Sequence, residues 1–460
     1  MTMTKGKRLS ALLAATALGG LMAVQPAAAQ SLQQLQSQVD ALSRQVEDLK
    51  KQKAGELKVE AKGAPRFSGD GFNKFKVRGR LMADFGHVGD DGTEQASLGT
   101  TTEFRRARLG VEGEITSFKY KFEIDFADNE VDIADAYLQW KGKPVSVTIG
   151  NQKTPNSLEE QTSSRFTSLM ERAQFTDAFG FSRELGIVLA TKGDDYTFKA
   201  GAFSNGGFSD DDEANGYAFA ARGTFSPKFD DVQMHFGAHL LYRDEGAAPT
   251  RYRQRPGIHT TDERFVDTRD ALPVFGDDGD SQDLNIENDL VFGAEVAAIW
   301  NSLHFASEFA YLTSDIDPTL EDDTIGGLTA LGDDKYQAWG GYAEVGYFIT
   351  GETRGYKADK GAFDRTKPKN PVNKGGMGAI QINARVDYLD LNDDDIFPVL
   401  GESPGEQLQI GVGVIWIPIS HVRFLVNYIY NDVSDAPFND NGLDGEGEYN
   451  VFGIRAQIDW

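Results

Sequence analysis

The chain has 460 residues, a formal net charge of −25 and no cysteine. The absence of cysteine excludes a disulfide framework, a thiolate metal site and a cysteine nucleophile, and the strong acidity argues against nucleic acid as a partner. Beyond the amino-terminal segment no run of roughly 18 or more apolar residues occurs, so the sequence offers no transmembrane helix.

Residues 1–29 have the pattern of an export signal. Three cations precede an apolar stretch from Leu9 to Val24, and Ala27-Ala28-Ala29 then supplies the small residues that a signal peptidase accepts. The pattern predicts a signal peptide that is removed from the mature chain.

A heptad seam follows the signal. Apolar residues recur with spacings of three and four, which predicts a short α-helical coiled coil over residues 30–53, and the seam consists of Leu32, Leu35, Val39, Leu42, Val46 and Leu49. About three heptads are marginal alone, so the partner helices must be held close by another part of the protein. The alternation of β-branched residues with Leu favours two strands, whereas a trimeric barrel would impose three. An amphipathic helix lying on a surface is the remaining alternative.

Residues 54–71, rich in Lys, Ala and Gly, are expected to be a linker. From there to the end of the chain, apolar and polar residues alternate in one segment after another. Between Phe118 and Phe126, for example, an apolar residue occupies every even position and a charged residue every odd one. This period of two indicates strands with one apolar and one polar face.

The alternating segments number sixteen, an even number, as expected for a bacterial barrel. They lie near residues 74–85, 104–115, 118–126, 133–140, 145–152, 184–192, 196–204, 216–225, 232–243, 287–300, 303–312, 336–350, 378–391, 407–418, 421–432 and 447–460. The sequence therefore predicts an all-β fold, a 16-stranded antiparallel transmembrane β-barrel over residues 72–460.

The connections between these strands alternate in length. Short turns such as Thr116-Ser117 are expected in the periplasm and long loops outside, which puts both chain ends and the coiled coil in the periplasm. The long connection 351–377 is an exception on the periplasmic side. Acidic runs such as Asp393-Asp394-Asp395 fall in the loops and are interpreted as solvated tips, with divalent cations bridging them to an anionic outer surface as the alternative.

With the apolar faces toward lipid, the first three strands turn basic side chains inward. The lumen wall is expected to carry Lys76, Arg78, Arg80, Arg106, Arg108, Lys119 and Lys121, with Glu123 and Asp125 among them. Charge held away from bulk water would raise the local anion concentration. The alternative is that cations and acids pair across the strands and cancel.

Two long connections carry further arginines. The connection 153–183 contains Arg165 and Arg172 and is expected to fold into the lumen and narrow it. The connection 244–285 contains a row of alternating arginines, interpreted either as a relay for phosphate-like anions or as an exposed, salt-bridged strand. The row consists of Arg251, Arg253 and Arg255.

Several stretches resemble the phosphate- and polyphosphate-selective outer-membrane porins of the O/P type. They span most of the chain from Phe72 to Trp460 in the family's order. The matching stretches are Glu103 to Leu109, Thr162 to Arg165, Met170 to Arg172, the row Arg251/Arg253/Arg255, Ile349 to Glu352 and Phe363 to Pro368.

The resemblance implies a trimer of 16-stranded barrels with a constriction, an arginine ladder leading in and lysines leading out. Carried over, the constriction consists of Arg105, Arg106, Arg165 and Arg172, and the ladder of Arg251, Arg253 and Arg255. The inward faces of the strands, without a matching family motif, add a basic wall of Lys76, Arg78, Arg80, Arg108 and Lys121. Because simple alternation turns Arg105 outward, its place at the constriction requires a β-bulge.

The predicted function is passive diffusion of small anions across the outer membrane, favouring phosphate or polyphosphate. The alternative is a general or cation-tolerant porin whose coiled coil tethers the membrane to the peptidoglycan cell wall. The expected partners are outer-membrane lipid, lipopolysaccharide, small anions and two further copies of the chain. No cofactor, metal or enzymatic activity is expected, because none of the six histidines has a spacing that suggests catalysis or metal binding.

Overall fold

The computed structural model describes residues 37, 40–45, 47, 57–69, 72–89, 98–204, 216–272, 283–317, 319–322, 327–330, 334–397, 403–436 and 446–460. The chain divides into two compact units, Met1–Leu57 and Lys58–Trp460. In the first unit residues 40–45 are α-helical and Leu42 is exposed. The predicted signal peptide and the other seam residues lie outside the described residues, so the coiled coil stays a prediction. No helix in the described ranges is long and apolar enough to cross a membrane.

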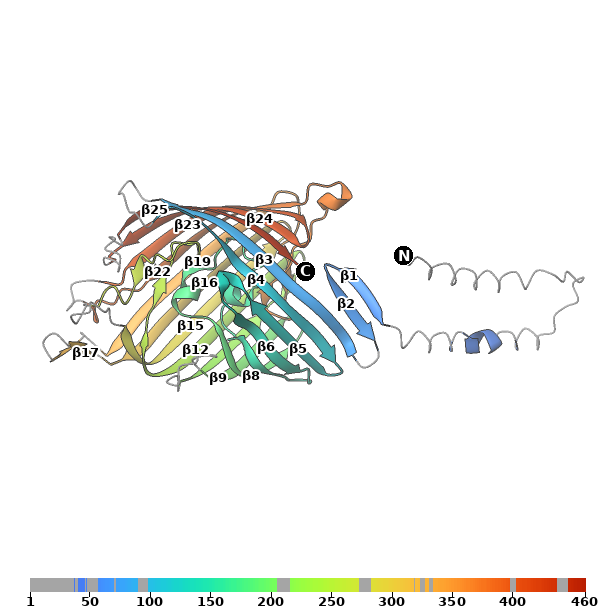
Figure 1. Cartoon of the computed structure of the whole chain (residues 1–460), viewed down its shortest axis with the longest axis horizontal. Helices are drawn as coiled ribbons and strands as arrows, with labels where there is room; N and C mark the ends of the chain where they lie inside the picture. Colours follow the sequence, from blue (N-terminus) through green and yellow to red (C-terminus); the bar gives the residue numbers. More distant parts are fainter. Residues whose placement is uncertain are drawn as a thin grey trace, which may run out of the picture. The chain divides into compact units, whose positions relative to one another are not determined.

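The second unit is a closed antiparallel barrel (Figure 1). Consecutive strands pair with one another, and the last strand returns to the first, from Asp459 opposite Arg80 to Asn450 opposite Gly89. The predicted sixteen strands are confirmed. They are β3 (Phe72–Gly89), β4 (Thr100–Ile115), β5 (Phe118–Asp125), β6 (Asp132–Trp140), β7 (Ser146–Lys153), β8 (Arg183–Lys192), β9 (Tyr196–Ser204), β10 (Tyr217–Phe225), β12 (Val232–Thr250), β15 (Leu284–Trp300), β16 (Leu303–Ile316), β19 (Lys335–Phe348), β22 (Ala379–Asp390), β23 (Glu406–Ile419), β24 (Val422–Ser434) and β25 (Gly447–Asp459).

Side chains on the wall alternate between the outside and the lumen, as the period of two requires. In β5, Phe118 and Phe122 are exposed on the outside while Glu123 and Asp125 are buried within. Large exposed aromatics gather near the strand ends, including Trp140, Trp300, Tyr347 and Trp339. Aromatic belts at both ends of an apolar band are typical of barrels that span a bilayer.

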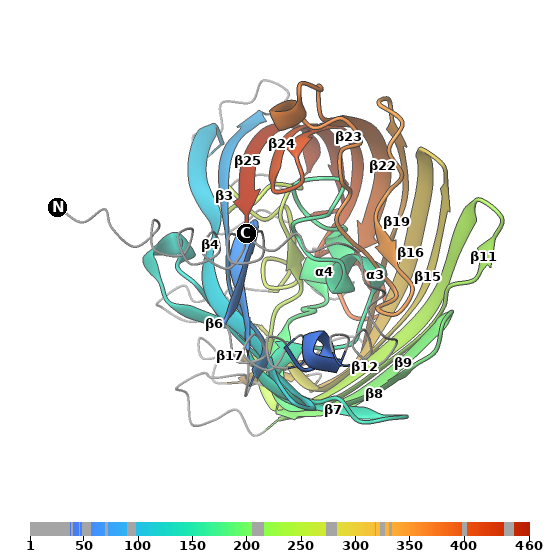
Figure 2. The same cartoon turned by 90° about the vertical axis from the view of Figure 1, so that its right-hand side faces the viewer.

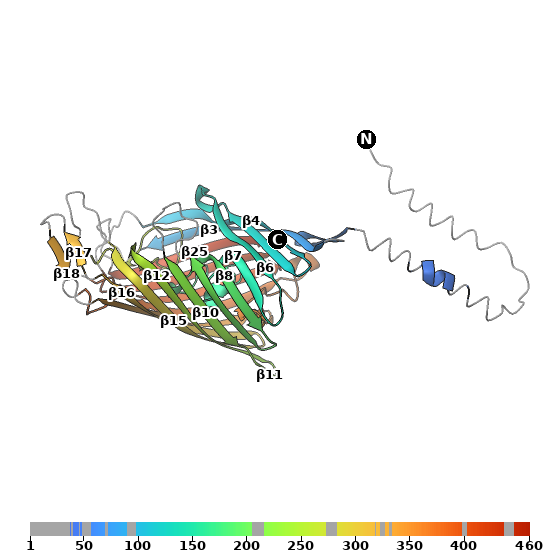
Figure 3. The same ribbon diagram turned by 90° about the horizontal axis from the view of Figure 1, so that it is seen from below.

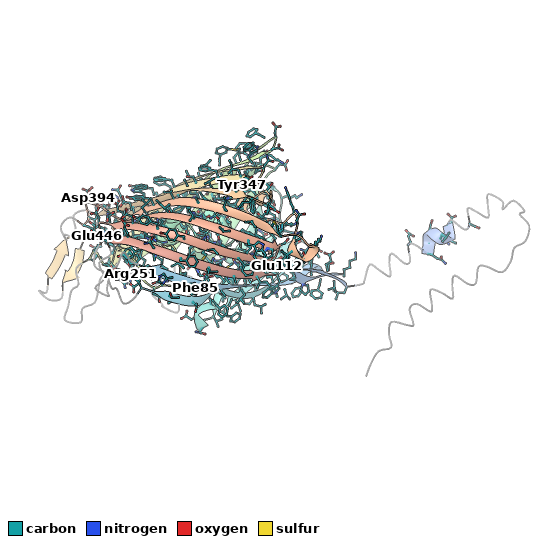
Figure 4. The ribbon with its side chains drawn as sticks, turned by 90° about the horizontal axis from the view of Figure 1, so that it is seen from above. Phe85, Glu112, Arg251, Tyr347, Asp394 and Glu446 are labelled. Atoms are coloured by element: carbon teal, nitrogen blue, oxygen red, sulfur yellow. The ribbon has the colours of Figure 1, made fainter. Side chains whose placement is uncertain are left out.

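The two ends of the barrel differ in their connections. At the short-turn end, two-residue turns such as Thr116-Ser117 and Asn301-Ser302 join the strands. Asn301 has a φ of 53°, a left-handed conformation that asparagine tolerates well. At the opposite, long-loop end lie Asp394 and Glu446, which Figure 4 labels. The carboxy terminus is at the short-turn end (Figure 1).

The segment expected to be a linker is partly a β-hairpin, and that expectation is corrected here. Strands β1 (Lys58–Lys62) and β2 (Ala64–Gly69) pair with each other, and β2 pairs with β3, Arg66 opposite Lys76. Strand β3 extends beyond the end of β25, so its edge would otherwise expose unpaired backbone groups, and the hairpin covers that edge. Gly63 turns the hairpin with a φ of 82°, where a Cβ would lie 2.6 Å from the ring of His421.

Three connections fold into the lumen. The inner loop (154–182) joins β7 to β8 and contains α3 (Leu158–Gln161) and α4 (Gln174–Ala178), which lie within the ring of strands in Figure 2. The outer loop (251–272) enters from the long-loop end and contains β13 (Arg253–Gln254) and β14 (Val266–Asp267). The turn loop (349–378) enters from the short-turn end and contains β20 (Tyr356–Lys357), β21 (Ala362–Phe363) and the 3-10 helix η2 (Val372–Lys374).

The remaining short elements lie at the barrel ends. Strands β17 and β18 form a separate hairpin at the long-loop end, away from the tilted wall strands (Figure 3). These elements are β11 (Lys228–Phe229), β17 (Thr319–Asp322), β18 (Gly327–Ala330) and the 3-10 helix η1 (Ala127–Asn129).

An apolar core occupies part of the barrel interior. Phe175 and Phe179 of the inner loop and Phe265 of the outer loop are buried in one cluster with inward-facing wall residues such as Leu241 and Leu389. Burying one such side chain is worth about 1.5–3 kcal/mol. Loops therefore fill the side of the lumen formed by β12 to β22 and leave space against the wall of β3 to β8.

The outward face generates a stability prediction. Val412 lies in the middle of β23 and is 47 % exposed on the outside. We expect Val412→Arg to lower the free energy of unfolding in lipid by about 2–4 kcal/mol, because the guanidinium would face hydrocarbon. Phe229→Arg, at the short-turn rim, should cost about 1 kcal/mol or less. Denaturant unfolding in vesicles measures both, and equal costs at the two positions would contradict the assignment of this face to lipid.

Candidate functional site

The inner loop is fixed to the wall by buried carboxylates at its start. Glu308 of β16 accepts hydrogen bonds from the backbone N–H groups of Leu158 (2.7 Å) and Glu159 (2.8 Å). Arg385 of β22 bridges Glu159 (3.0 Å) and Glu344 (2.7 Å). These contacts hold the loop against the strands that carry the apolar core.

The middle of the same loop is fixed by β25. Arg455 binds Asp84 at 2.6 Å and Glu171 at 2.8 Å, and Glu171 also accepts a bidentate pair from Arg105 at 3.0 and 2.9 Å. Burial would raise the pKa of Glu171, but the guanidiniums of Arg105 and Arg455 hold that pKa well below its usual range. Glu171 therefore remains a charged partner at neutral and mildly acidic pH.

A polar cavity of about 310 Å³ lies between the inner loop and the wall of β3 to β8. Of its seventeen lining residues eleven are Lys or Arg and two are acidic, in a protein whose net charge is −25. We call it the basic chamber, and its cations are Arg78, Arg80, Arg106, Arg108, Lys119, Lys121, Lys153, Arg165, Arg172, Arg183 and Lys360. Charges of one sign in a cavity with low-dielectric walls concentrate ions of the other sign.

Some of these cations pair with acids across the strands, as expected under the alternative in which the charges of the lumen wall cancel. Glu123 accepts from Arg78 (3.0 Å) and Arg80 (3.2 Å), and Asp125 binds Arg108 at 2.6 Å. In the described part of the chain, however, the cations outnumber the acids that reach them, and Lys119 has no carboxylate within 4.0 Å. The pairing orients the guanidiniums without cancelling the chamber's charge.

A second cavity of about 160 Å³ lies toward the long-loop end. Because it carries Glu160, Glu171 and Asp177 beside its arginines, we call it the mixed chamber. The outer loop lines it with the stretch from Gln254 to His259. The sequence predicted that the inner loop would fold into the lumen, and it does.

Three arginines line both chambers: Arg106 of β4, Arg172 of the inner loop and Arg183 at the start of β8. We call the place where the two chambers adjoin the passage. Arg172 donates to the carbonyl oxygens of Glu159 (2.9 Å) and Thr162 (3.0 Å), which fixes its fork. The passage brings together residues from distant parts of the chain.

Arg105 and Arg106 both face the lumen, although simple alternation turns Arg105 outward. Opposite them the pairing of β4 with β3 shifts register, from Met82↔Arg106 to Asp84↔Glu103, so β4 carries an extra residue there. This is the β-bulge that the sequence analysis required, and the simple register is corrected at this point. Arg105 lines the mixed chamber and binds Glu171.

The row of alternating arginines is not brought to one place. Arg255 lines the mixed chamber, Arg253 is exposed, and Arg251 binds Asp267 at 2.6 Å. The expected extended segment is only two residues long in β13, because the chain turns at Pro256. A continuous ladder is therefore not formed by these three residues.

Of the other predicted positions, some line a chamber and others do not. Arg165 lies in the basic chamber and binds Asp459 at 3.0 Å. Lys76 lies outside the lining of both chambers. Sequence reasoning did not select Lys153 or Lys360 for the site. The position of Lys153, directly before the inner loop, was the signal that could have found it, whereas nothing local distinguishes Lys360.

One buried cluster has the composition of a metal site. Ligand atoms of His239, Glu295 and Glu308 lie within 4.8 Å of one another. Arg222, however, binds Glu295 in a bidentate pair at 2.8 and 2.6 Å, and Glu308 already accepts two backbone N–H groups. A cation there would face a fixed guanidinium, so the cluster serves as an anchor for the inner loop.

Comparison with known proteins gives a family. The model of the phosphate-selective porin O and P family matches residues 75–460. The chain belongs to this family. An uncharacterised protein of Caulobacter vibrioides is 36 % identical over 417 residues, which cover 87 % of this chain and 76 % of the relative. Porin O of Pseudomonas aeruginosa is 26 % identical over 81 % of this chain and 86 % of its own length.

Solved structures share the porin's fold. The anion-selective porin from Comamonas acidovorans aligns with a TM-score of 0.51 at 10 % identity, covering 84 % of this chain and 99 % of that one. The outer membrane protein OmpT of Vibrio cholerae, in its trimer form, aligns with a TM-score of 0.50 at 13 % identity over 84 % and 99 %. The family and the closed barrel indicate an outer-membrane channel rather than an enzyme.

The charge of Glu171 generates a pH prediction for the porin. We expect Glu171→Gln to increase the anion preference measured by reversal potential, because it removes a negative charge from the mixed chamber. The lowered pKa means that the wild-type carboxylate stays ionised as the pH falls through the usual glutamate range. The difference between wild type and Glu171→Gln should therefore persist at about pH 4.5 and shrink only in stronger acid.

The lowered pKa of Glu171 also makes the stability of the folded porin depend on pH. The ion pairs of Glu171 contribute above the pKa of the unfolded carboxyl and are lost as the pH falls through the lower folded pKa. Asp394→Asn, at the long-loop end, is the control and should leave selectivity unchanged. Equal selectivity of wild type and Glu171→Gln at about pH 4.5 would contradict the lowered pKa.

Proposed function

We propose that the barrel conducts small anions and favours phosphate or polyphosphate. The observation that carries this proposal is the passage at Arg106, Arg172 and Arg183, which joins two cavities lined by cations in an acidic protein. The predicted constriction residues Arg105, Arg106, Arg165 and Arg172 all line one or both chambers. The family's description as phosphate-selective supports the choice of anion.

The chemistry of the passage suits a phosphate-like anion. Guanidinium forks match pairs of phosphate oxygens and stay charged at every physiological pH. Conduction also requires release, so an anion would pass between several weak sites in series. The basic chamber supplies such sites on the short-turn side, through Arg80, Arg108 and Lys121.

A general porin is the second candidate, and the acids of the mixed chamber favour it. Glu160, Glu171 and Asp177 face the same space as Arg255 and reduce its positive charge. In that case the acidic long loops and these carboxylates would govern entry. The sign of the reversal potential in a salt gradient separates the two candidates.

We also propose that the porin is a trimer with its short-turn end in the periplasm, in contact with lipid and lipopolysaccharide. Strands β5 to β7 have eight, nine and eight residues. At a tilt of about 45° they rise roughly 20 Å, less than the apolar band of about 25 Å. Neighbouring copies of the chain would cover the short strands β5 to β7, as the trimer form of OmpT from Vibrio cholerae suggests.

Arg106→Gln tests the passage. We expect the ratio of anion to cation permeability to fall on the order of tenfold, because the passage loses a charge that focuses the field. Reversal potentials in a potassium chloride gradient across a planar bilayer measure the ratio, and phosphate titrated against chloride current should block wild type at lower concentration than Arg106→Gln.

The matched control is Arg253→Gln, which removes an exposed arginine outside both chambers. It should leave both measurements unchanged. Unchanged selectivity in Arg106→Gln, or an equal loss of selectivity in the two variants, would contradict the proposal that the passage sets the anion preference. A cation-directed wild-type potential without phosphate block would establish the general porin instead.

The amino-terminal segment carries a separate proposal, that its coiled coil contacts peptidoglycan. Deletion of residues 32–50 should leave single-channel conductance unchanged, because the barrel is a compact unit that begins at Lys58. Envelope integrity, measured by detergent sensitivity of the cells, should fall. Loss of conductance with intact envelopes would contradict the tethering role.

A further inference from the structure

A small cavity lies behind the inner loop, on the side away from the mixed chamber. Its volume is about 20 Å³, and the inner loop, the turn loop and β22 to β24 all line it. Three of its lining residues are the arginines Arg354, Arg365 and Arg423. A cavity of this size holds one water molecule or one small ion and excludes phosphate.

Two of these guanidiniums are buried without a carboxylate. Arg354 and Arg423 are 5 % and 7 % exposed. Arg354 donates to Ser168 Oγ and to the carbonyl oxygen of Phe166, both at 2.7 Å, and Arg423 donates to the carbonyl oxygens of Arg165 and Thr167. Within the described ranges neither has a carboxylate within 4.0 Å.

The third arginine does not neutralise them. Arg365 binds Asp459, which also binds Arg165 at 3.0 Å, so this single carboxylate already serves two cations. Asp364, which lines the cavity, pairs with Lys357. Buried charges are expensive unless they are paired, and the pair of Arg354 and Arg423 lacks its counter-charge.

Two hydrogen-bond donors from residues that line the cavity also lack acceptors. Nε of Arg423 and Nε2 of Gln381 are buried and make no hydrogen bond. Gln381 is 2 % exposed. A buried donor without an acceptor is rare, so the Nε of Arg423 indicates that an acceptor belongs at the cavity, whereas the Nε2 of Gln381 lies beside Gly346 and His304.

We propose that this cavity is a binding site for a single halide-sized anion, such as chloride. The anion would supply the missing negative charge for Arg354 and Arg423. Both arginines hold backbone carbonyls of the stretch from Arg165 to Thr167, so the bound anion would stabilise the position of Arg165 in the basic chamber from behind. It is a structural ion, separate from the ions that pass through the pore.

Bromide, which has an anomalous X-ray signal, is the probe. Crystals of the full-length porin in sodium bromide should show an anomalous peak among Arg354, Arg365 and Arg423. Arg423→Met should lose that peak. Lys374→Met, which changes an exposed residue of the turn loop, should retain it. A cavity that contains only water in wild type, or bromide confined to the two chambers, would overturn the proposal.

A second measurement does not need crystals and starts from wild type. Thermal unfolding in chloride should occur at a higher temperature than in gluconate of the same ionic strength, with a saturable shift on the order of 5 °C at a hundredfold excess over Kd. Arg423→Met should lose this anion-specific shift whatever its own stability. An equal shift in wild type and Arg423→Met, or none in wild type, would overturn the proposal.

Discussion

The position of the inner loop is the constraint on which the pore depends. Glu308 fixes the start of the loop by accepting two backbone N–H groups, and Arg455 fixes its middle through Glu171. Between these points the loop turns Arg165 toward the wall of β3 to β8, and directly after Glu171 it turns Arg172 toward the same wall. Ion pairs formed in a low-dielectric interior are stiff and costly to break, so the loop can hold arginines at fixed positions in a passage exposed to water.

Packing inside the barrel makes the lumen asymmetric. Apolar side chains of the inner and outer loops, including Phe175 and Phe265, pack against β12 to β22 and fill that side. The remaining space lies against the wall where Arg78, Arg106 and Arg108 face inward. Segregation of this kind lets a protein with a net charge of −25 keep a cationic path, because many of its acids lie in the long loops.

Buried arginines serve two purposes in this architecture. Arg106 and Arg172 line the passage, whereas Arg354 and Arg423 hold the back of the inner loop through carbonyl oxygens. Carbonyl partners satisfy hydrogen bonds but supply no full charge. An anion bound behind the loop would supply the negative charge that these carbonyl partners lack. It would also make the stability of the constriction depend on the ions around the protein.

The sequence by itself determined the sixteen strands, their outward and inward faces and the basic character of the first strands. Alternation is a local property, because successive side chains on any strand point to opposite faces. Local pattern also identified Arg106 as a residue of the lumen, whereas the length of their connection and the family resemblance placed Arg165 and Arg172 there.

Only the tertiary structure decided which loops fill the barrel, that a bulge turns Arg105 inward, and that Arg255 alone of its row reaches a chamber. It also showed a hairpin where a linker was expected and brought Lys360 into the basic chamber. These outcomes depend on contacts between residues far apart in sequence, such as Arg455 with Glu171. No periodicity encodes such contacts, because they form only once the barrel has closed.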